Sequence, residues 1–317
     1  MSLKEAIKAR ALELGFARVG IARAEAIEPE GSRLRAFVEQ GRHASMQWLA
    51  DTVEVRADPA HPGMVPGARS VIVVAMPFAR PRSRAGLEPG RVARYAWGRD
   101  YHNVLRRPLR KLEAFLRERG HEARWSVDAR PVYERAWAQR AGIGFVGKNC
   151  CLIVPGIGSH VFLATVITTA ELEPDAPMKP RCGECRLCLD ACPTDAFVDA
   201  HQLDSNRCIS YLTIEHEGEI DAALQPKMGD WLFGCDVCQD VCPYNKTTPP
   251  AEPHEAFGPH ARLNGTLEQL LEMDEATFLQ WAEGSPMRRA GLKRMQRNAE
   301  IVLTNTKRHL PILDGEG

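Results

Sequence analysis

The stretch RCGECRLCLDACP, residues 181–193, decides how this chain folds. Its cysteines follow the spacing C-x2-C-x2-C-x3-C-P, which is the run that binds iron–sulfur clusters in bacterial ferredoxins. In that run the first three thiolates bind one 4Fe–4S cluster, and the fourth binds a second cluster. The sequence therefore predicts a two-cluster module that begins with Cys182, Cys185, Cys188 and Cys192.

A second, incomplete run follows in GCDVCQDVCPYN, residues 234–245. It has the C-x2-C-x3-C-P ending but no close first cysteine, and Cys208 can supply that ligand across an insertion. Zinc sites and free thiols are the alternatives, but zinc sites are built from paired C-x2-C knuckles with four ligands per metal. With two 4Fe–4S clusters, the two runs exchange their last cysteines. One cluster is then bound by Cys182, Cys185, Cys188 and Cys242, and the other by Cys192, Cys208, Cys235 and Cys238.

The other two of the ten cysteines, Cys150 and Cys151, open an expected strand, and we expect both to be buried small hydrophobes. Residues 1–13 carry charges throughout and lack the apolar stretch of a signal peptide. No apolar run approaches the ~20 residues of a membrane span. We therefore expect a cytoplasmic protein without membrane attachment, whose clustered thiols bind metal rather than form disulfides.

Upstream of the cysteines, strand and helix patterns alternate up to about Thr169, which predicts an α/β domain. SVIVVAMP, residues 70–77, is an apolar, largely β-branched run that is typical of a strand buried on both faces. CLIV and HVFLATVITT, residues 151–154 and 160–169, are expected to pair as a hairpin.

GIGFVG, residues 142–147, matches a dinucleotide fingerprint by its letters only. It lies between a helix and a strand, whereas that fingerprint lies between a strand and a helix. Its glycines either let the backbone approach a large flat ligand closely or simply form turns.

Two proline-rich segments, residues 170–180 and 247–259, mark boundaries in the chain, and the tail at 265–309 has helical patterns. We therefore expect an α/β domain in residues 1–170, a ferredoxin-like module in residues 171–250 and a helical C-terminal region in residues 251–317.

The formal net charge is zero, with 41 basic and 41 acidic residues, so the whole chain is not a polycation. The charges are segregated, however. Residues 80–135 contain fifteen Arg or Lys against seven Asp or Glu, and residues 286–309 contain seven against one, whereas acids dominate residues 195–275. Solvated faces would account for one such cluster, but two basic segments flanking a redox module favour a polyanionic substrate.

Six segments of the chain form one combination of motifs: CGECRLCLDACPTDAF, RCISYLTIEHEG, GCDVCQDVCPYN, YAWGRDYH at 95–102, VDARPVYERAWAQRAGIGFVGKN at 127–149 and VRADP at 55–59. Together they resemble the epoxyqueuosine reductases. The resemblance implies an oxidoreductase that uses cobalamin and two 4Fe–4S clusters to reduce epoxyqueuosine to queuosine at the wobble position of tRNA. It also implies an α/β cobalamin-binding domain, similar to those of reductive dehalogenases, before the bacterial-type two-cluster ferredoxin module. The helical C-terminal region would then be a short, HEAT-like remnant.

The resemblance also implies roles for single residues. Asp128 corresponds to the proton donor and Arg135 to an active-site arginine, although Asp128 could instead cap the helix that follows it. Cobalt ligation by His102 is left unassigned, because a lone histidine is more often not a metal ligand. The motifs that line the cobalamin or substrate cleft contain Arg56, Tyr101, His102, Asp128, Lys148, Asn149 and Ser210.

Two other functions account for part of the sequence: a corrinoid enzyme like the reductive dehalogenases that acts on small molecules, and an electron-transfer iron–sulfur protein. The first predicts no tRNA binding and usually an export signal. The second needs only the ferredoxin module, not the long α/β domain before it. We therefore expect the tRNA-modifying enzyme, with an anticodon stem-loop as substrate, an external electron donor such as a flavodoxin or a ferredoxin, and a monomeric state.

Overall fold

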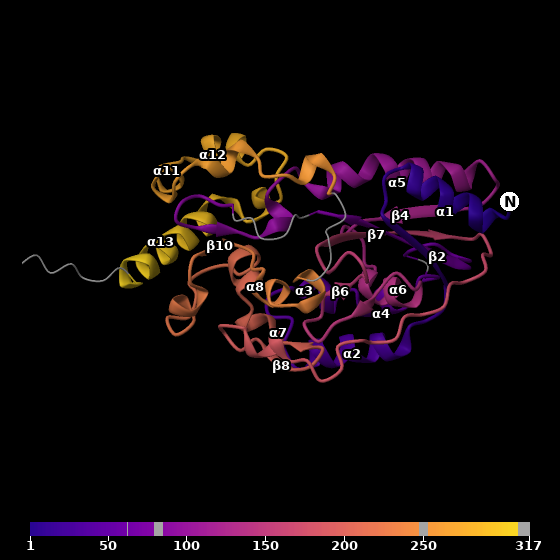
Figure 1. The fold of residues 1–317 in the computed structure, drawn as a ribbon, viewed down its shortest axis with the longest axis horizontal. Coiled ribbons are helices and arrows are strands. Elements are labelled where there is room, and N and C mark those ends of the chain that lie inside the picture. The colour runs from indigo at the N-terminus through magenta and orange to yellow at the C-terminus, as the bar shows by residue number, and fades with distance from the viewer. Residues whose placement is uncertain (62, 79–84, 247–252, 310–317) are drawn as a thin grey trace, which may run out of the picture.

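An antiparallel four-stranded sheet organises the N-terminal half of the chain (Figure 1). The structure is a computed structural model that describes residues 1–61, 63–78, 85–246 and 253–309. The strands lie side by side in the order β1 (Arg18–Arg23), β2 (Ser70–Pro77), β7 (Val161–Thr168) and β4 (Ala123–Ser126), and each neighbouring pair is antiparallel.

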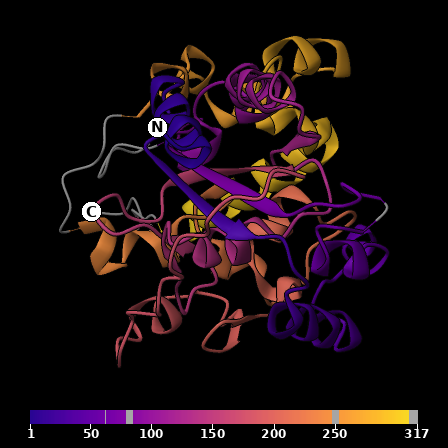
Figure 2. The same cartoon turned by 90° about the vertical axis from the view of Figure 1, so that its right-hand side faces the viewer.

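Helices cover both faces of this sheet (Figures 1 and 2). Every residue of β2 is buried, as the apolar run predicted, because side chains on both of its faces pack under helices. One face packs under α1 (Leu3–Glu13) and α5 (Tyr101–Arg117), whereas α6 (Glu134–Arg140) covers the other, with α2 (Glu28–Glu39), α3 (Gln47–Ala50) and α4 (Val53–Ala57) nearby.

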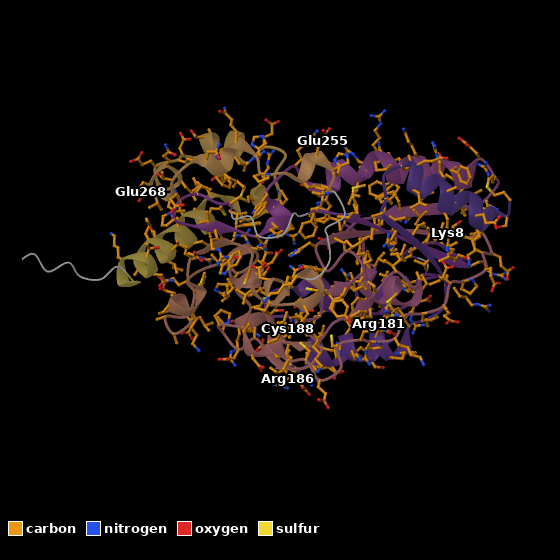
Figure 3. All side chains as sticks on the ribbon, viewed as in Figure 1. Lys8, Arg181, Arg186, Cys188, Glu255 and Glu268 are labelled. Atoms are coloured by element: carbon orange, nitrogen blue, oxygen red, sulfur yellow. The ribbon has the colours of Figure 1, made fainter. Side chains whose placement is uncertain are left out.

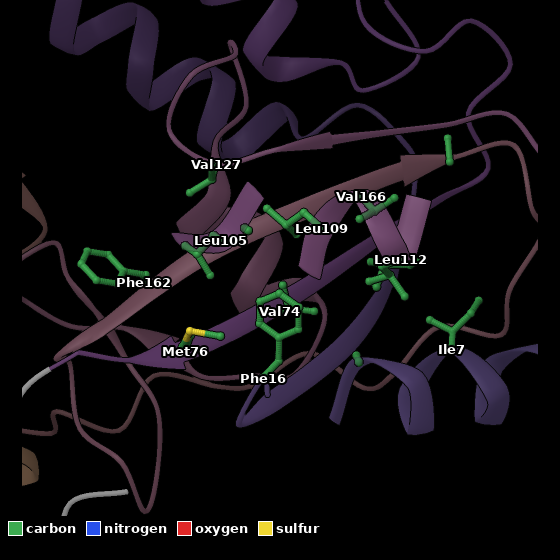
Figure 4. Close-up of a cluster of buried hydrophobic side chains, with 14 of the residues drawn as sticks. Ile7, Phe16, Val74, Met76, Leu105, Leu109, Leu112, Val127, Phe162 and Val166 are labelled. Atoms are coloured by element: carbon green, nitrogen blue, oxygen red, sulfur yellow. The ribbon is translucent and has the colours of Figure 1, made fainter. Parts of the chain in front are cut away.

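The helix α5 shows how the sequence positions the site. Leu105, Leu109, Leu112 and Leu116 recur at helical spacing, and all four are buried against the sheet (Figure 4). Truncating one such side chain to alanine typically costs about 2–5 kcal/mol. The packing therefore fixes the first turn of α5, which begins with Tyr101, over one end of the sheet.

The prediction that residues 151–154 and 160–169 pair as a hairpin is wrong. The short strand β6 (Leu152–Ile153) pairs instead with β5 (Phe145–Val146), while β7 joins the central sheet. The glycine-rich turn explains this pairing, because a Cβ on Gly144 would overlap the carbonyl oxygen of Ile153. Gly142 has a φ of +70° just after α6. These glycines therefore serve turns and close packing within the chain itself.

The cysteine-rich module and the tail consist of short elements. The module contains α7 (Leu187–Asp190), β8 (Phe197–Asp199), β9 (Gln202–Leu203), α8 (Ile209–Ile214), β10 (Trp231–Phe233), α9 (Val237–Asp240) and α10 (Pro243–Lys246). The tail is helical as expected, with α11 (Leu267–Leu271), α12 (Glu275–Trp281) and α13 (Gly291–His309). Short 3-10 turns are η1 (Arg94–Ala96), η2 (Ser205–Arg207), η3 (Gln225–Met228), η4 (Glu255–Phe257), η5 (Ala261–Asn264) and η6 (Pro286–Arg289).

One N-terminal segment joins the C-terminal part of the molecule. The strand β3 (Arg91–Val92) pairs in parallel with β10, and Trp97 shares a core with Phe278 and Met295 of the tail. The three expected units are therefore interleaved in space, and the boundary at residue 250 lies outside the described residues. Within the described ranges, no helix is both long and apolar enough to cross a membrane.

Candidate active site and cluster loops

The structure brings the cysteines of the first expected cluster together. Cys182, Cys242 and Cys185 are the thiols that face Cys188, and burial, reinforced by these neighbours, raises the pKa of Cys188 to about 11. Cys242 is buried beside Cys182 under Phe145. Cys242 of the second run thus lies with the thiols of the first run, as the predicted exchange of the fourth ligand requires.

The cysteines of the second expected cluster form a separate group. Cys208 and Cys192 are the thiols that face Cys235, and Cys235 and Cys208 in turn face Cys238. Across the described residues, no three thiols, carboxylates or imidazoles lie close enough to share one metal ion. Each ligand of a four-iron cluster binds a different iron atom, so its thiols need not converge on one point.

The two groups differ in exposure. Cys185 of the first group is exposed, and Figure 3 labels Cys188 and Arg186 at the lower edge of the module. In the same group Cys182 and Cys188 are half-buried and Cys242 is buried. No thiol of the second group is exposed, and burial is the main cause that raises the pKa of Cys208 and Cys235. The first group therefore reaches the surface through Cys185, whereas the second is the inner group.

The two additional cysteines are not the buried hydrophobes that we expected. Both are half-buried, and the Cys151 thiol lies next to the Cys238 thiol. Cys150 has a left-handed backbone with a φ of +63°, and burial raises its pKa to about 11. Sequence spacing could not reveal this position, because the contact joins residues almost ninety positions apart in the chain.

Lys148 and Asn149 hold the cluster loops. The Lys148 ammonium donates to the carbonyls of Gly183 and Cys185, at 2.7 and 3.0 Å. The buried Asn149 amide donates to the Cys238 carbonyl at 3.2 Å. Their polar ends thus contact the cluster loops, and their place in the cofactor cleft stays a prediction.

Asp128 lies at the end of β4, in the loop before α6, and two contacts fix it. The Tyr101 hydroxyl donates to Asp128 Oδ2 at 2.5 Å, and the Asp128 backbone N–H donates to Glu134 Oε1 at 3.2 Å. Asp128 does not cap α6, whose N-cap residue is Tyr133. The carboxyl of Asp128 is exposed and is therefore free to meet a substrate.

Glu134 was not anticipated from the sequence. Burial, reinforced by the charge of Asp128, raises its pKa to about 7. The same two causes raise the pKa of Tyr101, which keeps this hydroxyl neutral and able to donate. The position of Glu134 in the segment YERAW, directly before Arg135, was the signal in the sequence that could have identified it.

The two expected arginines frame this acidic pair. Arg56 Nη1 donates to the Val132 carbonyl at 3.1 Å, and its guanidinium lies over the Trp48 ring. Burial lowers the pKa of Arg56. Arg135 Nη1 donates to the Cys150 carbonyl at 2.5 Å, so this arginine connects α6 with the cluster side of the site.

The other expected residues lie around this centre. His102 Nδ1 lies 2.8 Å from Asp100 Oδ1, and its ring stacks on Tyr101 at a centroid distance of 4.2 Å. Ser210 lies in the first turn of α8, where its backbone N–H is hydrogen-bonded to the Cys208 thiol. His102 thus belongs to the Asp128 side of the site, and Ser210 belongs to the second cysteine group.

The C-terminal tail also reaches the site. Arg289 of η6 forms an ion pair with Glu215 at 2.8 Å, and the charge of Asp128 acts on this arginine. The charges of Asp128, Glu215 and Arg289 all act on the Tyr95 hydroxyl. The α/β domain, the cysteine module and the tail therefore meet at one place.

Comparisons with known proteins agree with this geometry. Residues 181–245 match the family model of a 4Fe-4S double cluster binding domain, and residues 56–129 match the model "Epoxyqueuosine reductase QueG, DUF1730". An epoxyqueuosine reductase from Gloeobacter violaceus is 40% identical over 305 residues, covering 94% of each chain. One from Pseudomonas aeruginosa is 40% identical over 320 residues, covering 98% of this chain and 88% of its own.

Solved structures extend the likeness to three dimensions. A crystal structure of an epoxyqueuosine reductase with an epoxyqueuosine-modified tRNA-Tyr stem loop has a TM-score of 0.88 and 34% identity, and covers 96% of this chain and 82% of its own. The Bacillus subtilis enzyme, with its catalytic aspartate loop swung out of the active site, has a TM-score of 0.86 and 35% identity, with the same coverage of both chains.

The fold and the site define an iron–sulfur oxidoreductase, in which a two-cluster ferredoxin module is fused to an α/β domain that carries the acid residues. Within that class, the chain belongs to the epoxyqueuosine reductase family.

Proposed function

We propose that this protein reduces epoxyqueuosine to queuosine in tRNA, with cobalamin as the reacting cofactor and two 4Fe–4S clusters as its electron supply. The observation that carries this proposal is the acid pair of Asp128 and Glu134 beside Arg135, which contacts the Cys150 carbonyl next to the second cysteine group, in a chain of this family. The tRNA stem loop held by the structural relative supports the substrate.

Several side chains of the site are open to a ligand. Tyr95, Tyr101 and Glu134 are half-buried and Arg135 is exposed, so each keeps a surface that a cofactor or a base can contact. Arg56, Tyr101, His102 and Ser210 are the residues that would hold a corrinoid or the modified base there.

Removal of an epoxide oxygen as water consumes two electrons and two protons. Bound cobalamin would supply the low-potential metal centre that gives electrons to the epoxide carbon. Asp128 is positioned to give a proton to the epoxide oxygen, because Tyr101 and Glu134 fix it from two sides. Arg135 is positioned to orient the diol or a phosphate of the nucleotide.

Electrons would enter at the surface cluster and leave from the inner one. Cys185 is exposed, whereas Cys238 and Cys208 lie on the inner side, where Cys151 and Arg135 connect them with the site. The rim of the surface cluster carries exposed Lys179, Arg181, Arg186 and Lys246 against Glu184 and Asp190. We propose that an acidic electron carrier, such as a flavodoxin or a ferredoxin, docks there.

Two measurements test this proposal. Anaerobically purified protein should contain cobalt together with roughly eight irons. It should also convert an epoxyqueuosine stem loop to queuosine with a chemical reductant, as judged by mass spectrometry of the released nucleoside. Iron without cobalt would favour an electron carrier, and turnover of organohalides without turnover of the stem loop would favour a dehalogenase-like enzyme.

The monomeric state, the cytoplasmic location and the unit boundaries at residues 170 and 250 stay predictions. Size-exclusion chromatography with light scattering tests the first of them, and limited proteolysis tests the boundaries.

A further inference from the structure

Arg94 lies where the N-terminal domain meets the second cysteine run. It follows β3, which runs parallel to β10, and β10 leads directly into Cys235. The two segments are packed tightly: the Ala93 N–H donates to the Phe233 carbonyl at 2.8 Å, and a Cβ on Gly234 would lie 2.6 Å from Ala93 Cβ. This register brings Arg94 against the residue after Cys235.

Arg94 holds two carboxylates of the cluster loop. Its Nη1 lies 3.0 Å from Asp236 Oδ2 and 2.6 Å from Asp240 Oδ1, and its backbone N–H donates to Asp236 Oδ2 at 2.9 Å. The side chains of Arg94 and Asp236 are only 8% and 4% exposed, and that of Asp240 is 32% exposed. Burying charges is unfavourable unless they are paired, and Nη1 of Arg94 pairs with both carboxylates, whereas its buried Nε has no hydrogen-bond partner among the described residues.

The two carboxylates that Arg94 contacts lie among the expected cluster ligands. Asp236 follows Cys235, and Asp240 lies between Cys238 and Cys242. One guanidinium therefore contacts the loop that supplies ligands to both clusters. The charges of Asp128 and Asp236 both act on the next residue, Tyr95. The segment that contains Arg94 and Tyr95 therefore extends from the cluster loop to the site of Asp128.

We propose that Arg94 is a positioning residue that sets the reduction potential of the inner cluster, held by Cys192, Cys208, Cys235 and Cys238, and fixes its loop against the active site. The proposal rests on the proposed function, in which this cluster passes electrons to the cofactor. Cluster potentials depend on nearby charge, and a reduced cluster carries one more negative charge than an oxidised one. Arg94 offsets the negative charge of the two carboxylates beside the ligand loop, so its presence favours the reduced form relative to a variant that lacks it, and burial limits screening by water.

The test measures the midpoint potentials of both clusters by EPR-monitored redox titration of the whole, anaerobically purified protein. Arg94→Gln should lower the potential of the inner cluster, so that its ratio of reduced to oxidised form at a fixed potential falls on the order of tenfold. Arg94→Lys keeps the charge and should restore most of the wild-type ratio. Asp240→Asn removes a negative charge and should shift the ratio in the opposite direction.

A matched control is available at the other cluster. Arg186 lies between Cys185 and Cys188 and pairs with Asp190 at 3.5 Å, but both side chains are 63% exposed. Arg186→Gln should leave both potentials unchanged, because solvent screens this pair.

The proposal is overturned if the clusters of Arg94→Gln and Asp240→Asn keep wild-type potentials. This holds even if the two variants contain less iron, because Arg94 would then have only a structural role. It is equally overturned if Arg186→Gln shifts its own cluster as much. If Arg94→Gln does not retain iron, Asp240→Asn and Arg94→Lys decide. Wild-type protein that fails to reduce the stem loop would contradict the proposed function, yet these potentials would still test Arg94.

Discussion

Asp128 adopts a left-handed backbone conformation, with a φ of +49°, although it carries a side chain. Such conformations cost of order 1–3 kcal/mol and persist where the surroundings impose them. Here Tyr101 holds the carboxyl and Glu134 holds the backbone N–H. The contacts that define the position of this acid therefore come from α5 and α6, not from its own loop.

Asp128→Asn should lose most epoxide reduction, by roughly 10²–10⁴-fold, while iron and cobalt contents stay at wild-type levels. The asparagine has nearly the same shape but cannot donate a proton as an acid. Single-turnover conversion of the stem loop, started with fully reduced protein, isolates this step from electron supply. Near-normal conversion would remove Asp128 from the chemistry.

Glu134→Gln should change how stability depends on pH. The pKa of Glu134 is about 7 in the folded protein against an ordinary value of 4.5, so the folded state binds this proton more tightly than the unfolded state. The stabilising contribution is therefore complete below pH 4.5 and is lost as pH rises to about 7. The glutamine variant should gain stability relative to wild type at pH 8 but not at pH 4.

Thermal midpoints at both pH values, followed by circular dichroism, check this prediction. Glu118→Gln serves as the control, because this side chain is exposed at the C-terminal end of α5. An equal difference between Glu134→Gln and wild type at both pH values would contradict the assignment.

Short helices carry the cluster ligands. The four-residue helices α7 and α9 each separate cysteines of a ligand run, and they pack against each other. Such short helices have little stability of their own, so contacts from elsewhere must hold them. Lys148, Asn149 and Arg94 provide those contacts from the N-terminal half.

Cys242→Ser should damage the surface cluster, although Cys242 follows the inner-cluster ligands Cys235 and Cys238 in sequence. Its thiol faces Cys182 and Cys185 instead. Iron should fall from roughly eight to roughly four per chain. Cys185→Ser should give the same EPR change, and combining both substitutions should remove no further iron. Loss of the signal that Cys238→Ser removes would instead show that Cys242 ligates the inner cluster.

At the scale of the whole molecule, two arginines of the tail hold it against the cysteine module. Arg297 of α13 donates to the carbonyls of Leu212, His216 and Gly218, around the C-terminal end of α8. Arg289 is paired with Glu215, which belongs to the acid-rich segment 195–275. Phosphate contact by the basic residues of the tail stays a prediction, and of these Arg288 and Lys293 are exposed.

The exposed face of α5 is the better candidate for RNA contact. Arg106 and Arg107 are exposed little more than one turn after Tyr101. Arg80, Arg82 and Arg84 of the same basic segment lie outside the described residues. Charge reversal of Arg106 and Arg107 should weaken binding of the stem loop without loss of iron or cobalt.

Affinity measured by fluorescence anisotropy should also fall steeply with salt, with a slope of about 0.7–0.9 per phosphate neutralised. Reversal of Arg117 and Arg119 gives a matched control, since Arg117 ends the same helix roughly 24 Å from Tyr101, at 1.5 Å per residue, and Arg119 follows directly after it. Equal effects of both pairs, or binding that does not change with salt, would exclude this face as the RNA-binding surface.

Local patterns were enough to determine part of this protein. The cysteine spacing, the apolar run of β2, the helices of the tail and the family motifs are all local, and each is read from residues close in sequence. They gave the α/β domain, the two-cluster module, the family and the candidates Asp128 and Arg135. Such features are predictable because spacing and periodicity reflect geometry within one loop, helix or strand.

Contacts between distant segments were decided only by the tertiary structure. The place of β7 between β2 and β4, the union of β3 with β10, the placement of Lys148 and the contact of Tyr101 with Asp128 depend on which surfaces pack together. No local pattern encodes these choices, because a pKa, a buried ion pair or a strand partner depends on groups that folding brings in from elsewhere in the chain.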